Sequence, residues 1–128
     1  MNAMKMQKGT GKPNLIQEKS YQFALEIMSL YKELIEEKEF ILSKQLVRSG
    51  TSIGANVEEA LAAQSRKDFI SKMSIASKEA RETNYWLRLL RDSNLIDKIE
   101  YSELINKSEE IIKILTAIVK TTQRKEQF

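Results

Sequence analysis

The 128-residue chain contains no cysteine and no histidine, and it has only one proline and four glycines. The lack of cysteine excludes disulfides, thiolate metal sites and cysteine nucleophiles. The lack of histidine removes the commonest general base and the commonest metal ligand together. We therefore expect a protein that is not an enzyme and that holds no metal and no cofactor.

Long apolar runs are also missing from the chain. The longest apolar segment, 111–119, is interrupted by Lys113 and is too short to cross a bilayer. Residues 1–13 have no apolar core of the kind found in signal peptides, so we expect them to form a disordered basic tail. These features predict a cytoplasmic protein with no membrane partner.

Charged residues make up 30% of the chain, and the formal net charge is +3. A composition rich in charge and poor in proline and glycine favours long, solvent-facing helices over β-sheet. A chain of this length is expected to form one domain whose core needs no disulfide or metal for support. The modest positive charge permits an anionic partner without requiring one.

Capping signals and the spacing of apolar residues predict four helices. A tight turn at 36–39 separates the first helix from the second, and Asn94 suits a left-handed cap at the end of the third. We expect helices from Asn14 to about 36, from about Ile41 to Ala63, from Ser65 to Asn94, and from Asp97 to about 122, with residues 123–128 frayed. Long helices with short connections predict an all-α, antiparallel up-down-up-down four-helix bundle over residues 14–122.

The third predicted helix carries a seven-residue repeat that starts at Phe69. Apolar or small residues recur in alternating steps of four and three, which keeps one stripe of the helix facing its partners. The first helix has as its apolar residues Tyr21, Leu25, Met28, Leu30, Tyr31, Leu34 and Ile35. The predicted core consists of Leu46, Ile53, Phe69, Met73, Ala76, Ala80, Leu87, Leu90, Leu104, Ile111, Leu115 and Ile118.

The second predicted helix contains Gly50 and Gly54. Each glycine costs a helix interior roughly 1 kcal/mol relative to alanine. A GxxxG pair promotes dimerisation in membranes only within an apolar span, and here Arg48 and Glu58 flank the pair. Close approach of a neighbouring helix in a soluble bundle is therefore the better explanation.

When the residues of the third helix are placed at about 100° per residue, its basic and acidic side chains fall on opposite flanks. One flank and the adjoining back carry Lys67, Lys78, Arg81, Tyr85 and Arg88. Lysine and arginine side chains along a helix can neutralise phosphates, and a tyrosine can stack on an exposed base. These five are the candidate nucleic-acid-binding residues, and the alternative is an ordinary solvated face.

The opposite flank of the same helix carries Ile75, Glu79, Glu82 and Trp86. These four are the candidate residues of a head-to-tail interface between copies of the chain, a type of contact that closes into rings. The alternative is ordinary surface charge, with Trp86 in the core of the monomer. A di-iron site built from the glutamates would need Glu-x-x-His motifs, which the chain lacks.

Three polar residues of the second helix, Arg48, Asn56 and Glu59, are expected to act mainly in folding or assembly and not in ligand binding. Arg48 and Glu59 point the same way but lie about 16 Å apart along the helix axis, because eleven residues separate their positions. They cannot pair with each other. Each is therefore expected to find a partner on another helix or on another subunit.

The chain also resembles a known family through a set of residues in its second and third helices. They are Gln45, Leu46, Val47, Arg48, Ser49, Ser52, Ile53, Asn56, Val57, Glu59, Ser65, Asp68, Phe69, Ile75, Ala76 and Glu79. Over about residues 17–122 the chain is similar to the bacterial four-helix-bundle family named for intervening sequences in 23S rRNA, also labelled an S23 ribosomal protein family. The resemblance implies an all-helical bundle without an established enzymatic activity.

The fold of that family is similar to that of the accessory variability determinant of diversity-generating retroelements. That protein forms a homopentameric ring, binds nucleic acid and associates with a reverse transcriptase. The resemblance therefore implies a homo-oligomer, with a pentamer favoured, and a reverse transcriptase or another protein as a partner.

Two functions remain open from the sequence. The first is a non-enzymatic oligomeric helical bundle that binds RNA or DNA, or that scaffolds a nucleic-acid enzyme. The second is a protein–protein adaptor without a physiological nucleic-acid role. The two-sided charge of the third helix supports the oligomer in either case, and the basic flank of that helix favours the first function.

Overall fold

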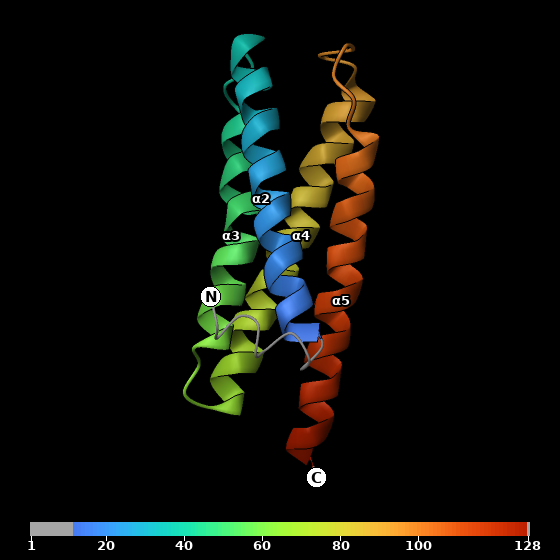
Figure 1. Cartoon of the computed structure of the whole chain (residues 1–128). Helices are drawn as coiled ribbons and strands as arrows, with labels where there is room; N and C mark the ends of the chain where they lie inside the picture. The colour runs from blue at the N-terminus through green and yellow to red at the C-terminus, as the bar shows by residue number, and fades with distance from the viewer. Residues whose placement is uncertain (1–11, 128) are drawn as a thin grey trace.

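The computed structural model describes residues 12–127 of the chain and the side chains of residues 15–125. These residues form four α-helices, which are α2 (Lys12–Glu36), α3 (Leu42–Leu61), α4 (Arg66–Ser93) and α5 (Ser102–Gln127). The connections lie alternately at opposite ends of the helices, so each helix runs antiparallel to the one before it (Figure 1). This arrangement confirms the predicted all-α up-down-up-down bundle.

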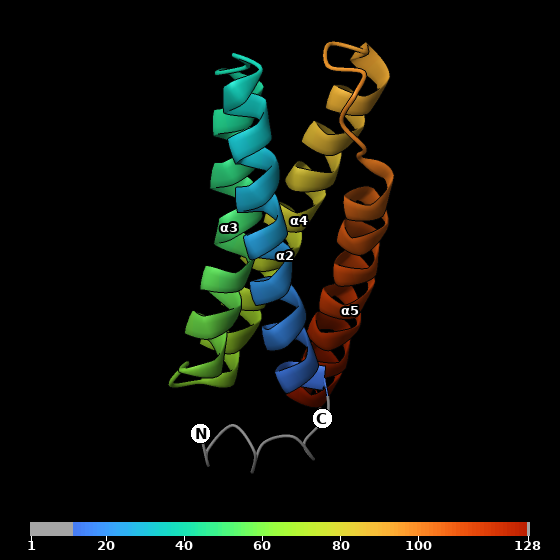
Figure 2. The ribbon, with the colours of Figure 1, turned by 45° about the horizontal axis from the view of Figure 1, so that its top comes forward.

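The bundle is tighter on some sides than on others. Each helix packs on the next along the chain, and α2 also packs on α5, but that last contact is the least extensive of the four. A second view shows α2 lying along α3, whereas α4 and α5 diverge from this pair toward the α4–α5 connection (Figure 2). The side between α2 and α5 is therefore the most open side of the bundle.

The outer ends of the first and last helices differ from the prediction. Helix α2 begins at Lys12, two residues before the predicted start. Pro13 therefore lies in the first turn, where a backbone N–H would have no helical acceptor in any case. Helix α5 continues to Gln127, so residues 123–127 are helical although they were predicted to fray. Of the predicted basic tail, residues 1–11 lie outside the described part of the chain.

The predicted turn after the first helix is confirmed, because α2 ends at Glu36. Lys38 adopts the left-handed conformation, with φ of 63°. The N–H groups of Lys38 and Glu39 donate to the carbonyl oxygens of Ile35 and Leu34, both at 2.9 Å. This is the hydrogen-bond pattern of a Schellman cap, formed here without the glycine that usually occupies the left-handed position.

Helix α4 begins and ends where its sequence predicts. The Ser65 hydroxyl accepts a hydrogen bond from the Asp68 N–H at 3.0 Å, which satisfies a backbone donor in the first turn. At the other end, Asn94 caps the helix in the left-handed conformation, with φ of 57°. Asparagine tolerates this conformation better than most residues.

The predicted start of the last helix at Asp97 is wrong, because α5 begins at Ser102. The intervening segment is used for packing, since Ile99 and Tyr101 are buried in the core. The Glu100 carboxylate accepts a hydrogen bond from the Ser102 N–H at the start of α5. A helix begun at Asp97 would not place both apolar side chains against the same core.

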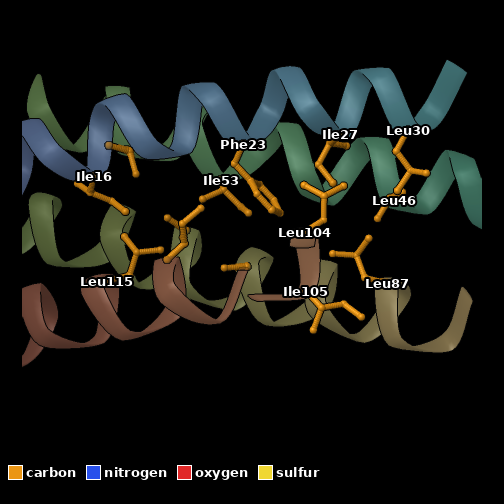
Figure 3. Packing of buried hydrophobic residues seen from close by; sticks show 14 of the residues in the cluster. Ile16, Phe23, Ile27, Leu30, Leu46, Ile53, Leu87, Leu104, Ile105 and Leu115 are labelled. Carbon is orange, nitrogen blue, oxygen red and sulfur yellow. The ribbon is translucent and has the colours of Figure 1, made fainter. Parts of the chain in front are cut away.

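The core lies along the bundle axis and draws side chains from all four helices (Figure 3). All but one of the predicted core residues are buried. The exception is Phe69, which is only half-buried and packs against the edge of the core, so its predicted place inside is wrong. Phe69 lies in the first turn of α4, at the end of the bundle, where neighbouring helices cover it less completely.

Helix α2 has apolar side chains on two opposite faces. Its buried face consists of Ile16, Phe23, Ile27, Leu30 and Leu34, together with the small polar Ser20. The other face exposes Tyr21, Leu25 and Met28, whose exposed fractions are 60%, 48% and 48%. Three of the apolar residues expected to characterise this helix therefore face away from the core.

Buried polar contacts fix the neighbours of α4. The Thr83 hydroxyl donates to the Ser49 hydroxyl oxygen of α3 at 2.8 Å. On the other side, the Asn84 amide donates to the Ser108 hydroxyl oxygen of α5 at 2.9 Å. Because an unpaired buried polar group is costly, a shift of either neighbouring helix along α4 would be unfavourable.

The predicted close packing at the glycines of α3 is confirmed for Gly50. A Cβ atom at Gly50 would lie 2.9 Å from the side chain of Ile27 on α2, which is too close for an ordinary contact. At Gly54 the nearest atom, the Ser20 carbonyl oxygen, would lie at 3.5 Å, an ordinary contact distance. Gly50 is therefore the position where a side chain would separate α3 from α2.

Candidate nucleic-acid interface

A groove between α4 and α5 gathers positive charge. It has a volume of about 300 Å³ and is lined by Ser74, Ser77, Lys78, Arg81, Thr116, Val119, Lys120 and Gln123. Three of these side chains are cationic, four carry a hydroxyl or amide group, and none is acidic. Cations and neutral donors together form a lining that suits phosphate and sugar oxygens.

Two of the predicted binding residues, Lys78 and Arg81, lie in this groove. The Arg81 guanidinium donates to the Thr116 hydroxyl oxygen at 3.3 Å, a contact that joins the α4 wall to the α5 wall. Neither lysine of the groove, Lys78 or Lys120, forms an ion pair with any residue in the described range. Both ammonium groups are therefore available to an anion from outside.

The α5 wall was missed when the third helix was considered alone. Within α5, residues 111–125 contain four basic side chains and no acidic one, whereas residues 102–110 contain three acidic side chains and one basic one. This change of sign along the last helix was the signal in the sequence that could have identified Lys120. Basic residues in the last turn of α5, Arg124 and Lys125, also interact favourably with the negative end of the helix dipole.

The other predicted binding residues lie outside the groove lining. Tyr85 is 49% exposed and contacts Trp86 edge to face, with ring centroids 5.1 Å apart. The Arg88 guanidinium lies over the Tyr85 ring, 5.9 Å from its centroid, and its Nε donates to the Asn84 side-chain oxygen at 2.7 Å. Lys67 is exposed in the first turn of α4.

The acidic flank of α4 makes contacts within its own chain. Arg48 of α3 pairs with Glu79 at 3.4 Å and also with Glu82. The indole N–H of Trp86 donates to the same Glu82 carboxylate at 3.0 Å, and the Trp86 ring is half-buried against the core. Ile75 is 38% exposed. Three of the four candidate interface residues, Glu79, Glu82 and Trp86, are therefore engaged within their own chain, and Ile75 is the remaining candidate.

The remaining polar residues of α3 form intramolecular contacts as well. Glu59 pairs with Lys72 of α4 at 2.8 Å, and this hydrogen bond raises the pKa of the Lys72 ammonium group. Asn56 donates to the Ser52 carbonyl oxygen within α3 at 2.9 Å. Arg48 and Glu59 thus find partners on another helix, as their spacing predicted, and both partners lie on α4.

Negative charge gathers on a different side of the bundle. A second groove, between α2 and the start of α5, is lined by Glu26, Glu33, Glu100 and Glu103, with Ser29, Leu30 and Leu104. Lys107 balances part of this charge, because its ammonium group lies 2.8 Å from Glu26. No group of three or more acidic side chains within the described chain is arranged to hold a metal ion. The two grooves would attract ligands of opposite charge.

No helix within residues 12–127 combines the length and the apolar character needed to cross a membrane.

The model of one protein family, the 23S rRNA-intervening sequence protein, matches residues 12–117. No curated protein matches the chain. Among solved structures, the chain is similar to a protein of unknown function from the S23 ribosomal protein family of Bacteroides thetaiotaomicron VPI-5482. That similarity has 54% sequence identity and a TM-score of 0.81, and it covers 85% of this chain and 98% of the other.

Proposed function

Because the chain belongs to the 23S rRNA-intervening sequence protein family, as its sequence predicted, we propose that it is a helical module that binds the phosphate backbone of nucleic acid in the α4–α5 groove. The observation that supports this most is the convergence of Lys78, Arg81 and Lys120 from two helices on a groove without an acidic lining residue. Positive charges held together repel each other, and a phosphate placed between them removes that repulsion.

The groove is suited to backbone contacts rather than to reading base sequence. Its neutral donors, Ser74, Ser77, Thr116 and Gln123, lie beside the cations and can bond to phosphate and sugar oxygens. Reading bases in a duplex usually requires a helix or β-ribbon that enters the major groove. In this bundle the cations lie in the groove between two packed helices, α4 and α5. We therefore expect binding with little sequence preference.

A titration of labelled oligonucleotide at several salt concentrations tests this function. If the three groove cations each neutralise a phosphate, the logarithm of the affinity should fall linearly with the logarithm of salt concentration, with a slope of about −2 to −3. Oligonucleotides of unrelated sequence should give similar values. An affinity that does not change with salt, or no binding at about 50 mM salt, would contradict the proposal.

Binding to protein is the second candidate function, and the exposed apolar face of α2 favours it. Tyr21, Leu25 and Met28 form a stripe that no other part of the described chain covers. Exposed apolar patches often mark interaction sites, and a head-to-tail contact between this stripe and another surface would close copies into a ring. Under this candidate, light scattering at micromolar concentration gives a multiple of 14.8 kDa. A strictly monomeric mass would exclude self-association through this stripe.

The two candidates are compatible with each other. A ring, with five copies favoured by the resemblance, would repeat the α4–α5 groove around the assembly. Several modest sites on one particle bind a long nucleic acid much more tightly than one site does. Such an assembly could also scaffold a reverse transcriptase on its template. An adaptor without a nucleic-acid role would instead assemble without binding nucleic acid in a salt-dependent way.

A further inference from the structure

Further basic side chains lie beyond the groove lining on both helices. On α5 the exposed cations are Lys113, Lys120, Arg124 and Lys125, and the first three recur at steps of seven and four. On α4 the basic residues extend from Arg66 to Arg88, a span of about 33 Å along the helix axis. They leave a gap of about 16 Å between Lys67 and Lys78, because Lys72 pairs with Glu59 of α3. The two walls stay adjacent along much of this span, because Arg66 contacts the Lys125 carbonyl oxygen and Arg81 contacts Thr116, each at 3.3 Å.

A double helix does not fit this arrangement well. In B-form DNA each strand winds around the axis and returns to the same face only once per turn, about every 34–36 Å. A straight line of cations would therefore follow one strand for only part of its length. The major groove, about 12 Å wide, admits one helix, whereas here two helices packed about 8–10 Å apart would have to enter together. The major groove of an RNA duplex is narrower still.

A single strand can follow the α4–α5 groove, and Tyr85 provides a surface on which one of its bases can stack. The Tyr85 side chain is half-exposed, and the Arg88 guanidinium lies over one face of its ring. A base that stacks on Tyr85 would take the opposite face or displace the guanidinium. Lys78 and Arg81 precede Tyr85 by seven and four residues, which places them about 10 Å and 6 Å away along the axis. These cations lie within reach of the phosphates that flank a base stacked on Tyr85.

Resting on the proposed function, we infer that the α4–α5 groove binds a single nucleic-acid strand in preference to a duplex. The phosphates follow the cations of α4 and α5, and one base stacks on Tyr85. Stacking on an aromatic side chain tolerates any base, because every base has a flat π-face. This mode agrees with the expectation of little sequence preference.

The experiment compares a labelled RNA strand of about 20 nucleotides, chosen not to fold on itself, with the same strand as a duplex, and repeats both with DNA. The unmodified protein should bind the single strands at least about tenfold more tightly. Tyr85→Leu should weaken single-strand binding roughly 5- to 100-fold and leave duplex binding unchanged, whereas Tyr85→Phe should bind normally. Phe40→Leu, which removes another exposed aromatic ring from the connection between α2 and α3, serves as the matched control.

Equal or tighter binding of the duplex would overturn the inference and leave the proposed function standing, provided that the affinity still falls with salt. Equal effects of Tyr85→Leu and Phe40→Leu would also overturn it, because Tyr85 would then contribute no stacking. If neither the strand nor the duplex binds in a salt-dependent way, the proposed function and this inference both fail. Circular dichroism of each variant verifies that the helices are intact.

Discussion

The double variant Lys78→Glu, Lys120→Glu is expected to bind a mixed-sequence oligonucleotide about 10- to 100-fold more weakly than the unmodified protein. Under the proposed function, each change removes one phosphate contact and places a negative charge in the groove. The slope of log affinity against log salt should become shallower by about 2, because each lysine accounts for about one released counterion. Anisotropy titrations over 50–200 mM salt measure both effects.

The two lysines are better targets than the arginines of the same surface. Arg81 bonds to Thr116 across the groove, and Arg88 bonds to Asn84 within α4, so reversing either charge would also disturb the structure. Lys78 and Lys120 have no ion pair in the described chain and are exposed.

The matched control is Lys32→Glu, Lys44→Glu, which makes the same change in net charge on α2 and α3. Both lysines are exposed and lie outside the lining of the α4–α5 groove. A similar loss of affinity in the control would mean that overall charge drives binding. Unchanged affinity in the groove variant, with its fold intact, would mean that the groove is only a solvated face.

Phe23→Ala is expected to lower the free energy of unfolding by about 3–5 kcal/mol, because Phe23 is a large, fully buried side chain and alanine would leave a cavity. This is a large share of the total stability of an ordinary domain, about 5–15 kcal/mol. Urea denaturation followed by circular dichroism measures the change. The variant should therefore unfold at a much lower urea concentration.

Two control substitutions separate burial from residue type. Phe69→Ala removes the same side chain from the half-buried edge of the core, and about half the cost or less is expected. Leu25→Ala changes the exposed face of α2, where surface substitutions usually shift stability by less than about 0.5 kcal/mol. If Leu25→Ala costs as much as Phe23→Ala, the face of α2 that contains Leu25 is covered in solution.

The overall fold could be predicted because α4 carries consistent local signals. Its serine cap, its seven-residue repeat and its asparagine cap agree with one another and with the structure. The ladder of small and apolar residues from Met73 to Leu90 can face only one direction. Local and tertiary preferences point to the same helix, which is the condition under which sequence patterns are most informative.

Helix α2 shows why part of the core could not be predicted. Its apolar residues occur on two opposite faces, so periodicity alone does not decide between the face with Phe23 and the face with Tyr21. The predicted start of α5 was wrong for a related reason. Asp97 and Glu100 provide a capping pattern, but the burial of Ile99 and Tyr101 depends on contacts with distant helices.

The candidate site was predicted only in part, since the residues of one helix define only one wall. Lys78 and Arg81 were found from the charge pattern of α4, whereas Thr116, Lys120 and Gln123 come from a different helix. Which residues of α5 face them depends on the register between α4 and α5, which the buried bond between Asn84 and Ser108 helps to fix. No spacing within a single helix contains that information.

Lysine footprinting tests the central claim most directly, because it shows where on the surface the nucleic acid lies. The protein is acetylated with and without a saturating single-stranded oligonucleotide at low salt, and each lysine is quantified by mass spectrometry. If the oligonucleotide binds in the α4–α5 groove, we expect strong protection of Lys78 and Lys120. The labelling of Lys32 and Lys44, which are exposed on α2 and α3, should not change. Protection of Lys32 and Lys44 with full labelling of Lys78 and Lys120 would contradict it.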